Sequence, residues 1–268
     1  MTIARSPWIL LGTLAAPACG SPAPDGRAPA HAERAPTPHA APHQGSAELH
    51  AQEHEIAEEL AQPAEDHRAR GHHRHHRFED AESWAAQFDS PDRAAWQKPD
   101  EVIAALSLRP DATVADLGAG TGYFAVRLAR AVPQGRVYAE DLEPDMVRYL
   151  GERATREGLA NVVALQGDAV DPKLPAAIDA AIMVDTYHHI VDPTAFFGRV
   201  REALRPGGAL VIVDFKKDAP EDAPGPPAAM RIADDVIAAH LQKLGFTHVR
   251  TDRELLPYQY VVFLRRPA

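Results

Sequence analysis

The sequence contains a single cysteine, Cys19, among its 268 residues. One cysteine excludes an internal disulfide, and its early position leaves the rest of the chain without a thiol for catalysis or for a cysteine-based metal site. Long runs of lysine and arginine are also absent, and the formal net charge is -10. Because nucleic-acid phosphates require a basic surface, nucleic acid is disfavoured as a partner and a small molecule is favoured.

Long hydrophobic runs are missing as well. The apolar stretch at residues 8 to 16 follows Arg5, precedes small residues and Cys19, and is too short to span a bilayer comfortably. This layout is typical of a signal peptide, which we predict for residues 1–19. The small residue before Cys19 resembles the cleavage site of bacterial lipoproteins, although Leu14 lies further upstream than usual and Pro17 interrupts the site.

This N-terminus leaves three locations open. A lipidated Cys19 would anchor the protein to a membrane, another type of signal would place it in the periplasm or outside the cell, and a misassigned start would leave it in the cytoplasm. The sequence alone does not choose among these three locations.

Residues 20–77 have almost no aromatic or branched apolar side chains and are rich in Ala, Pro, His and Glu. Such a stretch buries too little surface to offset its ordering entropy, so we predict a disordered tether. Ten of the fourteen histidines precede residue 77, four of them in GHHRHHRF at residues 71 to 78. They form either a ligand set for a divalent metal or a solvated segment, and without a carboxylate or cysteine partner at motif spacing we predict no defined metal site.

Apolar periodicity resumes near Phe78. The aromatic and aliphatic spacing over residues 78–110 predicts two or three short helices, which we treat as an N-terminal cap. Over residues 111–268, strand-length apolar runs alternate with helical patterns, the strands falling at residues 113 to 118, 136 to 141, 161 to 168, 179 to 185 and 209 to 215. This alternation indicates βαβ units and a parallel sheet covered on both faces.

The end of the chain breaks this alternation. Two further strand patterns, FTHVRTDREL and YQYVVFLRR, are separated only by Leu256 and Pro257 and must therefore pair antiparallel. The predicted fold class is α/β, a Rossmann-like doubly wound and mostly parallel sheet of seven strands that ends in an antiparallel hairpin, with helices on both faces.

The stretch VADLGAGTGYF, at residues 114 to 124, lies at the first strand-to-helix turn. Glycines 118, 120 and 122 let the backbone turn sharply and approach a ligand, which binds beyond the carboxyl ends of such strands. A dinucleotide motif needs its third glycine at position 123, where this chain has Tyr123. The motif instead resembles the first motif of the class I S-adenosylmethionine-dependent methyltransferases.

The resemblance extends over residues 96 to 265 and implies S-adenosylmethionine as the cofactor. Asp141, at the end of the second predicted strand, matches the acid that accepts the two ribose hydroxyls. Asp168 either matches the acid that accepts the adenine amino group or belongs, with Gly167, to a turn that only ends the strand. Glu140 should then point to the opposite face from Asp141. The full implied cofactor site is Asp116, Gly118, Gly120, Gly122, Asp141, Leu142, Met146, Asp168 and Ala169.

LRPGG, at residues 204 to 208, is also typical of this family, particularly of its quinone- and sterol-modifying branch. In that family Pro206 ends a helix and the two glycines make the turn into the next strand.

The segment DTYHH, at residues 185 to 189, ends the fourth predicted strand, where the family often positions its acceptor. The candidate catalytic residues are His188, Asp185 and His189; either histidine serves as a general base or both are ordinary loop residues. Tyr187, Tyr258 and Tyr260 are candidate substrate-binding residues. The aromatic residues of the cap either pack in the core or wall an apolar acceptor pocket.

The resemblance implies methyl transfer to a small organic acceptor by in-line displacement. One alternative is a module that binds S-adenosylmethionine or a related nucleoside without turnover, which suits an exported protein because the donor is made in the cytosol. An NAD-dependent oxidoreductase is disfavoured by Tyr123 and by the antiparallel ending. Arsenite methylation is disfavoured because it depends on cysteines that the domain lacks.

Overall fold

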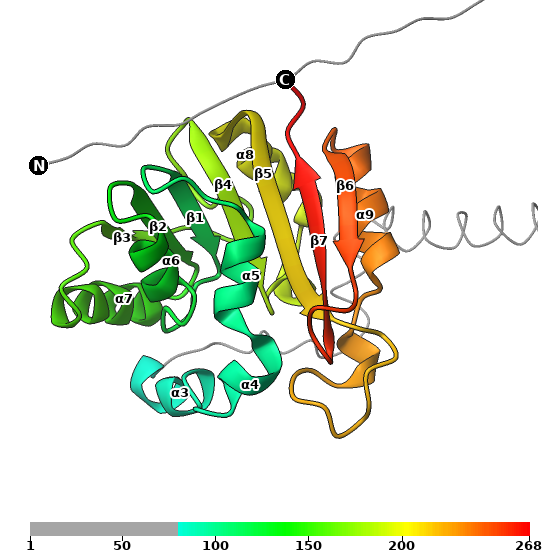
Figure 1. Cartoon of the computed structure of the whole chain (residues 1–268), viewed down its shortest axis with the longest axis horizontal. Coiled ribbons are helices and arrows are strands. Elements are labelled where there is room, and N and C mark those ends of the chain that lie inside the picture. Colours follow the sequence, from blue (N-terminus) through cyan, green and yellow to red (C-terminus); the bar gives the residue numbers. More distant parts are fainter. Residues whose placement is uncertain (1–79) are drawn as a thin grey trace, which may run out of the picture. The chain divides into compact units, whose positions relative to one another are not determined.

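The computed structural model describes residues 80–268 (Figure 1). The predicted signal peptide, the predicted tether and the histidine cluster at residues 72 to 76 lie outside these residues. Within residues 80–268, no helix has the length and apolar character needed to cross a membrane.

The centre of the fold is one seven-stranded sheet with the order β3-β2-β1-β4-β5-β7-β6. The first five strands in this order pair in parallel, whereas β7 pairs antiparallel with both β5 and β6. The predicted sheet, with its antiparallel ending, is therefore confirmed. The strands are β1 (Thr113–Leu117), β2 (Arg136–Asp141), β3 (Val162–Gln166), β4 (Ile178–Val184), β5 (Leu204–Phe215), β6 (Thr247–Asp252) and β7 (Gln259–Arg265).

Helices cover both faces of this sheet, as Figure 1 shows. They begin with residues suited to a helix N-terminus: Pro144 occupies the first turn of α7, and the Asp192 side chain accepts a hydrogen bond from the Ala195 N–H at the start of α8. The helices are α3 (Ala81–Phe88), α4 (Arg93–Gln97), α5 (Pro99–Ala105), α6 (Ala125–Ala131), α7 (Pro144–Arg156), α8 (Pro193–Ala203) and α9 (Asp234–Lys243), with short 3-10 turns η1 (Tyr187–His189) and η2 (Ala228–Met230).

The two faces bury two separate apolar clusters. Val102, Leu128 and Leu150 bring α5, α6 and α7 onto the face that carries Val114 and Ile182. On the other face, α8 and α9 pack against alternate residues of the same strands, among them Leu117, Met183 and Ile212. Strands that are buried on both sides read as continuous apolar runs, which is the pattern of β4 and β5.

Polar contacts attach the cap helix α3 to α7 and to the glycine turn. The Ala81 N–H donates to the Asp145 carboxylate at 2.7 Å, and Arg153 on α7 donates to both oxygens of Asp89 at 2.9 and 2.8 Å. Arg153 also donates to the Thr121 carbonyl beside the glycine turn, at 2.9 Å. These bonds hold the cap across the edge where the parallel strands end (Figure 1).

The LRPGG segment is part of β5 in the structure, not a turn before it. Leu204 pairs with Ile178 and Ala209 with Ala180, so the residues between them form an irregularity in the ladder. Gly207 has a φ of 76°, a left-handed conformation suited to glycine. The glycines therefore serve a bulged entry into the strand.

Candidate functional site

A cavity of about 780 Å³ lies at the carboxyl edge of the strands. Its walls come from the turn after β1, the ends of β2 and β4, the cap helices, and the segment after β5. Ligands of open α/β sheets bind at this edge, and the volume is within the range of small-molecule sites, about 300 to 1,000 Å³.

The glycine turn forms the floor of this cavity. Gly118, Gly120 and Gly122 have φ values of 64°, 56° and 91°, all in the left-handed region. A Cβ at Gly118 would lie 2.4 Å from Cγ2 of Thr186, and one at Gly122 would lie 2.8 Å from Cδ2 of Leu150. Conformation therefore favours glycine at both positions, and space also requires it at Gly118, whereas the end of the Leu150 side chain could shift to make room at Gly122.

Three buried carboxyl groups line the same floor: Asp116, Glu140 and Asp141. Burial is the main cause that raises the pKa of each one, and the charge of Asp141 raises the pKa of both Asp116 and Glu140 further. The pKa of Asp116 rises to about 7, and its Oδ2 has no hydrogen-bond partner among the described residues. The floor is thus an acidic, partly unsatisfied surface.

Asp141 is placed at the end of β2 as the sequence predicted. Its carboxylate accepts hydrogen bonds from the N–H groups of Gly120, at 2.8 Å, and Glu143, at 2.9 Å. Because these bonds come from the glycine turn and from the entry to α7, they fix the carboxylate in the cavity wall.

Glu140 does not point away from the cavity, contrary to the strand-alternation prediction. Its carboxylate accepts from the Gly118 N–H at 3.3 Å, and it lines the cavity together with Asp141. At the last residues of a strand a long side chain can pass beyond the sheet edge. Gly167 leaves room for it, since a Cβ there would lie 2.0 Å from Oε1 of Glu140.

The remaining predicted cofactor residues also border the cavity. Met146 is buried, whereas Leu142 is 49% exposed. Asp168 accepts from the N–H groups of Val170 and Asp171, so its carboxylate belongs to a tight turn beside Ala169. All nine residues of the predicted cofactor set are near this edge, and eight line the cavity: Asp116, Gly118, Gly120, Asp141, Leu142, Met146, Asp168 and Ala169.

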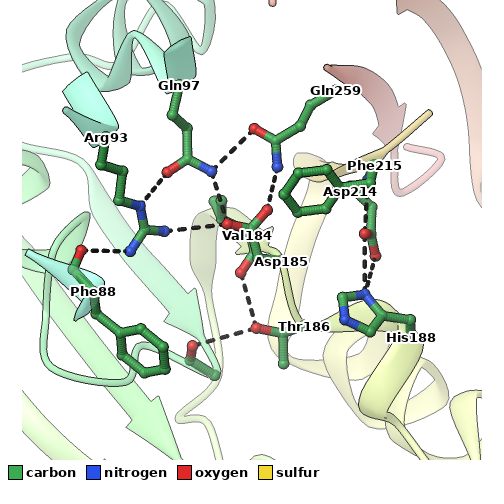
Figure 2. Close-up of polar contacts among 11 residues, drawn as sticks. Phe88, Arg93, Gln97, Val184, Asp185, Thr186, His188, Asp214, Phe215 and Gln259 are labelled. Carbon is green, nitrogen blue, oxygen red and sulfur yellow. Dashed lines mark hydrogen bonds and ion pairs between the residues drawn. The ribbon is translucent and has the colours of Figure 1, made fainter. Parts of the chain in front are cut away.

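Asp185 is engaged in a structural network (Figure 2). Its carboxylate accepts from Arg93 at 3.2 Å, from Gln97 at 2.8 Å, and from Gln259 on β7. Burial raises the pKa of Asp185, and Arg93 opposes that rise. Since three donors occupy this carboxylate, it fastens α4 to the sheet and is not placed as a free catalytic base.

His188 has a different environment from Asp185. Its Nδ1 lies 3.0 Å from both carboxylate oxygens of Asp214, at the end of the neighbouring strand β5, as Figure 2 shows. His188 and His189 both line the cavity, and their rings are 4.2 Å apart. The structure therefore brings both candidate histidines to the site.

The three candidate substrate-binding tyrosines do not line this cavity. The Tyr187 hydroxyl is buried and lies 2.7 Å from Nδ1 of His240, while the Tyr260 hydroxyl donates to the Ile232 carbonyl at 2.8 Å. Tyr258 packs beside Trp96 with ring centroids 6.3 Å apart. Tyr187 and Tyr260 thus belong to the α9 side of the core, and Tyr258 lies behind the cavity-lining Trp96, so none of the three is placed as a direct wall of the cavity.

Sequence reasoning missed Asp214, Arg93 and the segment at residues 224 to 230. Asp214 ends the predicted fifth strand, and the carboxyl ends of neighbouring parallel strands share one edge, so its position beside the histidines was available as a signal. No comparable pattern pointed to Arg93, because its contact with Asp185 spans 92 residues of sequence. The position of the loop after β5 follows from how that loop packs, which the sequence pattern does not show.

The family model for the methyltransferase domain matches residues 108–249. The chain belongs to this family. The matched residues include β1 to β5 whole and end within the first half of β6. The cavity floor and the pair of His188 and Asp214 are therefore within the family domain.

Individual proteins agree with this assignment. The chain is similar to the malonyl-[acyl-carrier protein] O-methyltransferase of Hahella chejuensis, with 29% identity over 49% of this chain and 47% of that protein. It is also similar to the ubiquinone/menaquinone biosynthesis C-methyltransferase of Cupriavidus taiwanensis, with 28% identity over 43% and 48% of the two chains. The chain thus spans about half the length of these two curated relatives.

A solved structure extends the likeness to three dimensions. The S-adenosylmethionine-dependent methyltransferase of Aquifex aeolicus superposes with a TM-score of 0.64 and 28% identity, over 69% of this chain and 97% of that one. The mixed sheet and its flanking helices are accordingly those of a Rossmann-like methyltransferase fold, and S-adenosylmethionine is the cofactor class that this fold binds.

The residues on the cavity floor fit this cofactor. S-adenosylmethionine carries a positively charged sulfonium and an amino group, and the floor offers buried carboxyl groups, one of which has an unpartnered oxygen. A dinucleotide would instead bring two phosphates against Asp116, Glu140 and Asp141. The acidic floor therefore selects the cationic ligand.

Proposed function

We propose that this protein transfers a methyl group from S-adenosylmethionine to a small organic acceptor, and that the cavity at the carboxyl edge is the active site. The observation that supports this most directly is the acidic floor beneath the glycine turn. Buried carboxyl groups with raised pKa values cluster at functional sites, and these three converge on one cavity.

The donor occupies the half of the cavity beside β1, β2 and β3. Asp141 accepts the two ribose hydroxyls, Asp168 and the Ala169 N–H address the adenine, and Leu142 and Met146 flank the ring. Asp116 holds the amino group with its unpartnered Oδ2. When bound, S-adenosylmethionine supplies a methyl group that its sulfonium already activates toward a nucleophile.

The protein contributes position and the exclusion of water. The cap helices α3 and α4 cover the cavity and are fastened by Arg153 to Asp89 and by Arg93 to Asp185. Fixing the acceptor against the methyl group removes translational freedom, an effect that accounts for much of the acceleration of such displacements. A cavity histidine takes the proton where the acceptor carries one.

For the whole chain, we propose three parts before the catalytic core at residues 111–268: a lipoprotein-type signal at 1–19, a tether at 20–77 and the cap at 78–110. The pattern around Arg5 and Cys19 supports an anchored or exported protein. The test compares the cell fractions of the full chain and its Cys19→Ala variant. Membrane recovery of the full chain that the variant loses would support lipidation, and identical fractions would reject it.

Titration calorimetry of the full chain with S-adenosylmethionine, its demethylated product and NAD tests the donor site. We expect the first two to bind and NAD not to bind. Asp141→Ala is the test variant. Asp179→Ala is its control, because Asp179 lies at the start of β4, away from the carboxyl edge that carries the cavity, and accepts there from the Thr113 N–H. If neither sulfur ligand binds, the methyltransferase assignment of this cavity fails.

A further inference from the structure

The two cavity histidines differ in what holds them. The His188 side chain is 4% exposed and that of Asp214 is fully buried, and Nδ1 of His188 is 3.0 Å from both Asp214 oxygens. His189 is exposed and lies beside the His188 ring. A carboxylate at Nδ1 fixes the proton on that nitrogen, so Nε2 of His188 is the ring nitrogen with a lone pair.

Asp214 has no other charged partner among residues 80–268. It pairs with Tyr260 through the β-ladder, its Oδ1 also accepts from the Phe215 N–H, and His188 is its one ion-pair partner in the described part of the chain. A fully buried carboxylate is costly unless it is hydrogen-bonded or paired. The pairing with His188 is therefore the contact that makes this buried charge tolerable.

Besides Asp214 on β5, titratable or charged groups near His188 come from the end of β4, from α4 and from its own turn η1. Asp185 directly follows β4, Arg93 on α4 pairs with Asp185, and His189 shares η1 with His188. Burial alone would lower the pKa of His188, but the hydrogen bond and charge of Asp214, together with Asp185, outweigh it and raise that pKa. A stronger base results, and it acts in its neutral form.

The acceptor half of the cavity is apolar. Trp96 packs beside Phe215, with ring centroids 6.0 Å apart, and the segment at residues 224 to 230 adds prolines and Met230. Gly225, with a φ of 110°, sits directly on the Phe215 ring, where a Cβ would lie 2.3 Å from Cζ. The fully buried Arg231 holds this segment by donating to the carbonyls of Ala219, Pro220 and Pro226.

No lysine or arginine among the described residues of this cavity is free to pair with an anionic acceptor. Arg93 is the only lysine or arginine among the described residues that line it, and its guanidinium already contacts Asp185, Gln97 and the Phe88 carbonyl. A carboxylate on the acceptor would also be repelled by the carboxyl groups of the acidic floor. The charge balance therefore favours an uncharged acceptor.

We propose that His188 and Asp214 form a proton-accepting pair and that the acceptor is an uncharged, apolar, ring-bearing molecule whose reacting group is a hydroxyl. This inference rests on the proposed function. A phenolic hydroxyl ionises near pH 10, well above neutrality, so it needs such a base, whereas a thiol with a pKa of about 8.5 needs it less. Asp214 is a positioning residue, because it acts through His188.

The step balances as follows. The acceptor hydroxyl gives its proton to Nε2 of His188, and its oxygen bonds to the methyl carbon. The bond between that carbon and sulfur breaks, and its electron pair stays on sulfur. His188 later releases the proton to solvent.

The test uses the full chain with two matched pairs of acceptors: para-propylphenol against para-propylbenzoate, and naphthol against naphthoate. Formation of the demethylated donor is the activity readout. We expect methylation of the hydroxyl members and little of the carboxylates. Donor binding with transfer to the carboxylates, or to no hydroxyl member, overturns the acceptor class and leaves the proposed function standing; loss of donor binding would defeat the proposed function itself.

Two variants test the pair independently of the acceptor. His188→Gln should lower kcat about 100-fold with donor affinity nearly unchanged. Asp214→Asn should shift the rising limb of the kcat/KM profile, and the NMR titration of the His188 ring, to lower pH, because the carboxylate that raises this pKa is lost. Asp235→Asn is the matched control, since Asp235 is exposed and bonds only locally to Val236. An unmoved His188 titration in Asp214→Asn overturns the pair.

Discussion

The two halves of the cavity are built by different means. On the donor side, backbone N–H groups of the glycine turn contact carboxylates at the end of the next strand, within 22 residues of sequence. On the acceptor side, side chains from α4, from the residue after β4 and from β7 meet across 74 to 162 residues. The donor site is thus a property of a short motif, whereas the acceptor site is a property of the folded whole.

The largest expected effect separates the cost of the close contact with Thr186 from the cost of a left-handed backbone conformation. Gly118→Ala should lower the free energy of unfolding by about 2 to 5 kcal/mol, because left-handed backbone costs about 1 to 2 and overpacking against Thr186 about 1 to 3. Gly158→Ala is the control, since Gly158 has a φ of 68° and nothing within 4 Å of an added Cβ. Equal losses in urea unfolding would show that the contact with Thr186 carries no weight.

The next effect concerns the donor itself. Asp141→Ala should weaken S-adenosylmethionine binding by about 2 to 4 kcal/mol, because a hydrogen bond to a charged acceptor contributes about 1.5 to 3 kcal/mol and two bonds to one carboxylate are less than additive. Calorimetry measures the change, and thermal unfolding checks that the fold survives the loss of the Gly120 and Glu143 contacts. Unchanged affinity in a folded variant would remove Asp141 from the donor site.

A third change sharpens the contrast from the acceptor side. Gly225→Ala should raise the acceptor KM by about tenfold, or about 1.4 kcal/mol, because the added methyl group displaces the segment from Phe215. Donor affinity should stay nearly constant. Gly207→Ala is the control, having a φ of 76° and open space around its Cβ position. If Gly225→Ala weakens donor binding as much as it raises the acceptor KM, the donor and acceptor halves of the cavity do not act independently.

The smallest effect is a pH dependence of donor binding. In the protein without donor, the pKa of Asp116 is raised to about 7. The cationic amino group of the bound donor should lower this pKa, so donor binding should release a proton from Asp116. Affinity should therefore rise with pH, by at most about tenfold per unit, and level off above about pH 7. Calorimetry in buffers of different ionisation enthalpy measures the proton release. Asp116→Asn should abolish it, and a release that persists in this variant would assign it to another group.

How much was predictable follows the same division. The strand alternation and the glycine spacing placed Asp141 at the end of β2 and the antiparallel hairpin at the end of the chain, because both follow from local periodicity. Asp185 was a candidate catalytic residue because it ends the fourth predicted strand. Its engagement with Arg93 and Gln259 depends on how α4 and β7 pack, which no local pattern encodes.

The tyrosines show the same limit. Period-two alternation decides which face of β7 carries Tyr260, but the hydroxyl partner at Ile232 comes from a loop whose path is set by Arg231. Glu140 fails for a different reason, because strand alternation stops governing side-chain direction where the strand ends.

Arg231 has one further consequence, for how such a protein can change over evolutionary time. Its guanidinium donates hydrogen bonds to main-chain carbonyls, and a carbonyl is present whatever side chain its residue carries. Replacements among the wall residues of this segment therefore leave the fastening intact. Substitutions in this segment can therefore change which acceptor fits without changing the path of the loop, while the residues of the donor site stay the same.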